Sequence, residues 1–190
     1  MEKKKIITVI IVILLVILVL RRLSKTFFPV KFDNMGNRII TESEIKSAFQ
    51  KCAALYGTEY ARSVERLFRK ETAHFKSGQF LKTLSPGMEI SGGTNSTKTT
   101  FPYGWSSLSS FQSANPLYLK STFYVHRMNE NGTGLGKTFI GFPTIESSVM
   151  FVAWFIKNTR GGRFGKWYSM NESSALSYEN SLKQITAKYV

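Results

Sequence analysis

The sequence has 190 residues, and its 26 Lys and Arg against 12 Asp and Glu give a formal net charge of +14. A chain of this length can form one core of ordinary domain size plus a short appendage. The single cysteine, Cys52, excludes an intramolecular disulfide, and one cysteine with two histidines is too few for a thiolate zinc cluster. We therefore expect one domain that needs neither a metal nor a cofactor, with Cys52 as an inert core thiol.

The positive charge predicts an anionic partner, such as a cell-wall polymer, a lipid surface or nucleic acid. Part of the charge belongs to the N-terminal segment, but more than half of it lies beyond residue 40. The domain itself is therefore expected to be moderately basic.

An apolar run follows the basic N-terminus. Residues 6–20, IITVIIVILLVILVL, are uncharged and stand between MEKKK and RRLSK. As a helix they would extend about 22 Å, which reaches across a hydrocarbon core of ~30 Å if the flanking Lys and Arg side chains snorkel. No small-residue cleavage site follows, so residues 1–22 are predicted to be a retained membrane anchor rather than a cleaved signal peptide. Basic residues on both sides leave its orientation open.

Turn and cap signals divide the rest of the chain. Residues 23–40, with a proline and a glycine, are predicted to be a juxtamembrane linker. The domain over 41–190 opens on Thr41–Glu44, a capping box whose helix should stop at Gly57. Thr58 is expected to cap a second helix.

The second half of the domain changes in composition. Residues 76–105 are rich in Gly, Ser and Thr and are predicted to form turns and short strands, and from there to Asn131 no element is assigned. Thr144 then caps an apolar helix that closes at the glycines 161–162, and a final helix should begin near Ser173 and run toward Lys188. The predicted fold class is α+β, mainly α, with a small β-rich lobe between two pairs of helices and a transmembrane helix in front.

Glu71 stands where the pattern of its helix requires an apolar side chain. Val64, Leu67, Phe68 and Phe75 share its helix face at spacings of three and four. A carboxylate in such a place is costly to ionise, so its pKa should rise and it can remain a proton donor near neutral pH. A glycosidase acid needs this state. The structural alternative is an ion pair with Arg or Lys across a helix contact.

Four segments, in chain order, resemble the motifs of one family. ETAHF at 71–75 is similar to the Glu-Ser-x-Trp/Phe catalytic motif of the lysozyme superfamily, in particular of bacterial glucosaminidase-type peptidoglycan hydrolases. FPYGW at 101–105 resembles their Asn-Leu-Phe-Gly-Ile, and FIGFPTIESSV at 139–149 resembles their Phe-x-x-Tyr-x-Ser-x-x-Glu-Ser. GKWYSMNESSALSYENSLKQI at 165–185 resembles their closing Tyr-Ala-Thr-Asp-x-x-Tyr-x-x-Lys-Ile. A threonine replaces the serine of the first motif, a tryptophan ends the second, and the third is one residue short.

The resemblance implies a lysozyme-like domain in which Glu71 is the general acid. A second carboxylate would have to come from the β-rich lobe, where Glu89 is the candidate and an exposed loop charge is the alternative. The N-acetyl group of the substrate could replace that second carboxylate. Glu146 follows a helix cap and is expected to be a structural charge.

Sugars bind to proteins through aromatic rings that stack on pyranose faces and through polar side chains. Tyr103 and Trp105 flank a glycine in an expected cleft loop, and Tyr168 follows a glycine-rich turn. These three are the favoured substrate-binding residues, with Tyr178 as a further candidate. Trp154 lies inside an apolar helix and is expected in the core.

The sequence thus predicts a membrane-anchored glycosidase that cleaves the β-1,4 glycan strands of peptidoglycan. Its partners would be those strands and the lipid bilayer around residues 6–20, with no specific nucleic acid. The substrate lies outside the cytoplasm, which would place the N-terminus inside and the domain outside the membrane of a bacterium or of a phage virion.

Two alternatives stay open. A lytic transglycosylase would use the same acid, although the chain lacks the Gly-Leu-Met-Gln sequence common in that class. A noncatalytic, membrane-tethered protein would instead use its basic face to hold nucleic acid or a structural partner.

Overall fold

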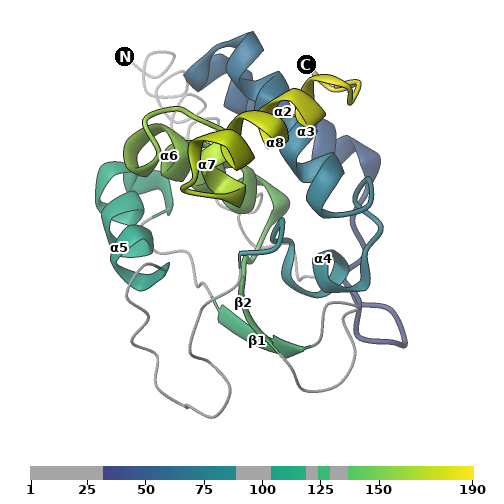
Figure 1. Cartoon of the computed structure of the whole chain (residues 1–190). Helices are drawn as coiled ribbons and strands as arrows, with labels where there is room; N and C mark the ends of the chain where they lie inside the picture. The colour runs from purple at the N-terminus through teal and green to yellow at the C-terminus, as the bar shows by residue number, and fades with distance from the viewer. Residues whose placement is uncertain (1–31, 89–103, 119–123, 129–136) are drawn as a thin grey trace, which may run out of the picture. The chain divides into compact units, whose positions relative to one another are not determined.

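The computed structural model describes residues 32–88, 104–118, 124–128 and 137–190 (Figure 1). The chain separates into two compact units, 1–31 and 32–190, and the second contains all of the described residues. The predicted anchor and most of the predicted linker lie outside them. Within the described part of the chain, no helix combines the length and the apolar composition that a membrane crossing needs.

Four helices, α2, α3, α6 and α8, make up the larger part of the domain (Figure 1). Helix α2 packs on α3 and α6, and α3 packs on α8 as well as on α6. The chain order is α2 (Glu42–Tyr56), α3 (Thr58–Glu71), α4 (Gly78–Thr83), α5 (Gly104–Ala114), a 3₁₀ turn (Pro116–Tyr118), β1 (Tyr124–Met128), β2 (Lys137–Gly141), α6 (Ile145–Thr159), α7 (Gly165–Tyr168) and α8 (Glu172–Lys183).

The core consists of the apolar faces of these helices. Helix α6 contributes the unbroken buried run 147–153, as expected for a helix that is covered on several sides. Phe49 of α2 meets Phe68 of α3 edge to face, with ring centroids 5.6 Å apart. Cys52 is fully buried here, and desolvation raises the pKa of its thiol to about 12, so the expected inert thiol is confirmed.

Two of the expected helix caps are confirmed, and one was wrong. Thr41 and Glu44 form the capping box of α2, and the hydroxyl of Thr144 accepts a hydrogen bond from the amide of Ser147 at the start of α6. Thr58 is not a cap but the first residue of α3, because Gly57 is both the C-cap of α2 and the N-cap of α3. Gly57 has a φ of +90°, a conformation that favours glycine and allows the chain to reverse within one residue.

The lobe between α3 and α6 contains more helix than the composition predicted. The described part of it has helices α4 and α5 and one antiparallel pair, β1 with β2, in which Tyr124 faces Gly141. The prediction of turns and strands was therefore wrong for residues 78–83 and for residues 104–105 at the start of α5, and the rest of α5 lies where no element was assigned. Helix α5 exists because it buries Leu108 and Phe111 on one face, and this burial outweighs the modest helix propensity of its serines.

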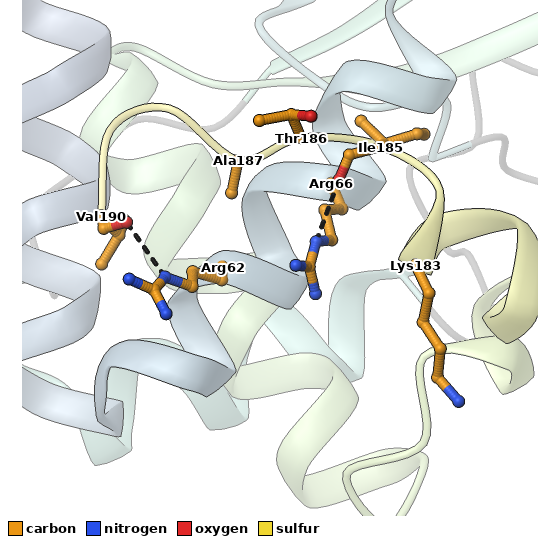
Figure 2. Close-up of a pocket in the computed structure, with 7 residues that line it drawn as sticks. All are labelled: Arg62, Arg66, Lys183, Ile185, Thr186, Ala187 and Val190. Carbon is orange, nitrogen blue, oxygen red and sulfur yellow. Dashed lines mark hydrogen bonds between the residues drawn. The ribbon is translucent and has the colours of Figure 1, made fainter.

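The last helix ends earlier than predicted. Helix α8 stops at Lys183, and residues 184–190 continue as an extended strap along α3 (Figure 2). Glu65 of α3 is fully buried, and its two carboxylate oxygens accept the amides of Lys188 at 2.7 Å and Tyr189 at 3.0 Å. These bonds need an extended chain, so the helix cannot run on to Lys188.

Arg69 neutralises the buried charge of Glu65. Its Nη2 lies 2.6 Å from Glu65 Oε1, and both side chains are nearly inaccessible to solvent. The guanidinium also lies over the rings of Tyr189 and Phe75, 4.7 and 5.2 Å from their centroids. The strap is thereby tied to the end of α3 and to the turn that follows it.

Candidate active site

Glu71 is the last residue of α3, and the side chain after it closes the helix. The hydroxyl of buried Thr72 donates to the carbonyl of Phe68 at 2.5 Å and accepts the amide of Phe75 at 2.8 Å. The Phe68 carbonyl also accepts the amide of Thr72 at 3.0 Å, so the hydroxyl is its second donor and links the end of α3 to the turn that follows. The threonine that replaces the serine of the resembled motif keeps this hydroxyl.

The turn after Glu71 has an unusual backbone. Ala73, His74 and Phe75 have φ values of +47°, +57° and +70°, all in the left-handed region. Each such residue costs roughly 1–2 kcal/mol relative to the right-handed form. The amide of His74 donates to the carbonyl of Arg69 at 2.8 Å, and the ring of Phe75 is buried in the core, so packing holds the strained turn in place. Strain of this kind, directly beside Glu71, is typical of functional sites.

The carboxyl group of Glu71 lies between α8 and the turn after α4. The hydroxyl of Tyr178 donates a hydrogen bond to Oε1, and a Cβ placed on Gly87 would lie 4.0 Å from Oε2. Gly87 is in the turn 85–88, where the Ser85 hydroxyl accepts the amide of Met88 at 3.1 Å. Oε1 of Glu71 is thus hydrogen-bonded to Tyr178, and Oε2 faces the turn 85–88.

Burial raises the pKa of Glu71. Desolvation is the largest cause, and it outweighs two effects that lower the pKa, the hydrogen bond from Tyr178 and the positive charge of Lys70. No ion pair with an Arg or Lys forms at this carboxylate within the described part of the chain. The alternative of a structural ion pair is therefore not found, and the group is suited to carry a proton at higher pH than an ordinary glutamate.

Tyr178 and Tyr168 form a stack beside this carboxyl group. Their rings are nearly parallel, at 4°, with centroids 5.1 Å apart. Tyr178 is 6% exposed, and its pKa is raised by desolvation and by the charge of Glu71, so its hydroxyl stays a donor. Tyr168 is 68% exposed and offers an aromatic surface next to the acid. Lys70 Nζ lies 5.4 Å from the centroid of the Tyr178 ring.

The structure brings together Glu71, Tyr168 and Tyr178 from opposite ends of the domain. Trp105 is in the first turn of α5, but its side chain is outside the description, and Glu89 and Tyr103 are outside the described residues altogether. The predictions for these three residues therefore stay predictions.

Some residues of the site have roles that the sequence did not indicate. Tyr178 was expected to stack on a sugar, but its buried ring leaves little free surface, and its hydroxyl binds Glu71 instead. Gly87 was missed, although it is the glycine of a Pro-Gly pair at 86–87, which is a strong turn signal. The contact of Lys70 with the ring of Tyr178 was not predicted either. None of the three contacts follows from spacing alone.

Glu146 is engaged elsewhere, at the start of α6. Its carboxylate pairs with Lys51 of α2 and accepts a hydrogen bond from the hydroxyl of Tyr118 at 2.9 Å. This arrangement fits the structural role expected for it. Within the described residues, no group of three or more His, Cys, Asp and Glu side chains could hold a metal ion.

Comparison of the chain with protein-family models, with curated proteins and with solved structures found no match.

Proposed function

We propose that the chain is a glycosidase that cleaves the β-1,4 glycan strands of peptidoglycan, with Glu71 as the general acid. The observation that carries the proposal is the partly buried carboxyl group of Glu71, whose pKa is raised and whose Oε1 is fixed by Tyr178. A carboxyl group whose pKa is raised keeps its proton to higher pH than an ordinary glutamate and can donate it to the oxygen of a leaving sugar. The four motif-like segments support the same function.

The substrate would bind across Tyr168, whose exposed ring can stack on a pyranose next to the acid. The basic character of the chain suits an anionic wall. The apolar run 6–20 would hold the domain at the outer face of a bacterial or virion membrane.

Three mechanisms can complete the reaction after Glu71 protonates the leaving sugar. None of the charges that act on the pKa of Glu71 comes from another carboxylate of the described residues. Glu89, the N-acetyl group of the substrate, or a transglycosylase reaction without attacking water would each complete the mechanism.

The test is the substitution Glu71→Gln, which keeps the shape of the side chain but removes the transferable proton. Clearing of purified peptidoglycan by the full chain in a neutral detergent should fall by at least ~10²-fold, the scale of general-acid catalysis. Glu146→Gln removes a carboxylate that is bound outside the site and should leave the rate nearly unchanged.

Mass spectrometry of the released fragments then identifies the bond and the mechanism. Reducing ends indicate hydrolysis, and anhydro ends indicate a transglycosylase. If a folded Glu71→Gln protein clears peptidoglycan at the normal rate, Glu71 is not the acid, and the noncatalytic alternative becomes the better hypothesis.

A further inference from the structure

A second concave site lies on another face of α3. It is a hollow of about 280 Å³ between α3 and the strap 184–190, and its charged lining residues are Arg62, Arg66 and Lys183 (Figure 2). Arg62 and Arg66 are four residues apart and so share one side of the helix. Glu71 points about 140° away from Arg66 around the helix axis. The hollow is therefore separate from the candidate active site.

The two arginines are held in place by the strap. Arg62 Nε donates to the backbone oxygen of Val190, and Arg66 Nε donates to that of Ile185, each at 3.1 Å (Figure 2). The strap is itself fixed by the buried carboxylate of Glu65. These bonds use the inner nitrogens of the guanidinium groups, and in Figure 2 the outer nitrogens of Arg66 lie between Arg62 and Lys183. Much of the ordering cost of binding an anion is thus met by the fold.

Two of the three cations lack a compensating carboxylate. Arg62 pairs with Glu59 at 2.6 Å, and its Nε also bonds a main-chain oxygen of Val190, which is a carboxylate oxygen in the 190-residue chain. Arg66 and Lys183 form no ion pair with any described residue, and the only recorded contact of Lys183 Nζ is a 3.5 Å approach to Asn180. A second hollow beside the first is lined by the same Arg66 and Lys183, together with Arg163 and Glu179, which pair with each other at 3.5 Å. Arg66 and Lys183, the two cations without an ion pair among the described residues, therefore line both hollows.

We propose that this hollow binds a phosphate group. The planar fork of Arg66 can form two parallel hydrogen bonds to phosphate oxygens, and Lys183 adds a mobile point charge. A tetrahedral group with several acceptor oxygens can engage both cations at once, whereas a carboxylate has only two oxygens. The phosphate could belong to a phosphodiester polymer of the cell wall or to a lipid headgroup. The site does not depend on the proposed glycosidase activity, since a noncatalytic protein would have it too.

The test is calorimetric titration of the full chain, in a neutral detergent at low salt, with inorganic pyrophosphate. Arg66→Gln and Lys183→Gln should each weaken binding by about 10-fold or more, because each removes a charge-assisted hydrogen bond. Lys46→Gln removes the same charge from an exposed position on α2 and should change the affinity by less than about 2-fold.

Three results would overturn the proposal. The first is that the unaltered chain does not bind pyrophosphate, and the second is that the Lys183→Gln variant binds it with unchanged affinity. The third is that all three substitutions weaken binding equally, which would show a nonspecific charge effect. Lys183 is exposed, so its substitution tests the site even if the Arg66 variant folds poorly. Competition with a soluble glycerol phosphate polymer, or with a short-chain phosphatidylglycerol below its micelle concentration, then distinguishes the two sources of phosphate.

Discussion

The substitution Tyr178→Phe tests how the domain sets the proton affinity of Glu71. The Tyr178 hydroxyl donates to Glu71 Oε1, and this bond favours the ionised carboxylate against the desolvation that raises its pKa. Phenylalanine removes the donor but keeps the ring that stacks on Tyr168 at 5.1 Å. The pKa of Glu71 should therefore rise further.

The magnitude follows from the strength of one hydrogen bond to a charged group. Such a bond contributes about 1.5–3 kcal/mol. One pKa unit corresponds to ~1.4 kcal/mol, so complete loss of the bond would raise the pKa of Glu71 by roughly one to two units. Glu71 is only partly buried, and water can replace part of the lost donor. We therefore expect the lower end, about one unit.

The sign of the effect on activity is fixed by the role of the acid. A general acid must be protonated, so activity falls as the pH rises through its pKa. In the Tyr178→Phe variant, this alkaline limb should move about one unit to higher pH. The decline should be measured as the rate of glycan cleavage against pH.

A direct titration measures the pKa of Glu71 independently of any enzymatic activity. The ¹³C resonance of the Glu71 carboxyl carbon reports its pKa whether or not the protein is an enzyme. Tyr168→Phe, which removes an exposed hydroxyl with no recorded bond to Glu71, is the matched control and should leave the pKa in place. An unchanged or lower pKa of Glu71 in the folded Tyr178→Phe protein would refute the proposed hydrogen bond.

Two further predictions concern stability and can be measured by urea unfolding. A Cβ on Gly165 would lie 2.0 Å from a backbone oxygen of α8, so Gly165→Ala should cost about 3 kcal/mol or more through displacement of that helix. Gly36→Ala meets nothing within 4 Å and should cost only ~1 kcal/mol of left-handed strain, and equal losses would contradict the argument. Glu65→Gln leaves Arg69 buried without a compensating charge and should cost about 3–5 kcal/mol. Its control, Glu59→Gln, breaks an exposed pair and should cost less than ~1 kcal/mol, and a similar small loss for Glu65→Gln would show that the buried network is not needed.

Features that depend on neighbouring residues could be predicted from the sequence. The capping box at Thr41, the stop at Gly57 and the cap at Thr144 involve groups within a few residues of each other, and all three are present. The same holds for Glu71, whose place on an apolar helix face follows from spacings of three and four. Its burial and the direction of its pKa shift were therefore accessible from the sequence.

Features that depend on distant partners were decided by the tertiary structure. Tyr178 lies 107 positions from Glu71, and only the packing of α8 on α3 turns its hydroxyl toward the acid. The end of α8 was likewise set from outside, because buried Glu65 takes amides from residues 123 and 124 positions away and so holds the strap extended. Helix α5 forms from a serine-rich segment because the core accepts Leu108 and Phe111. In each case, a contact across the fold outweighs a local preference of at most about 1 kcal/mol per residue, and spacing along the chain carries no record of that contact.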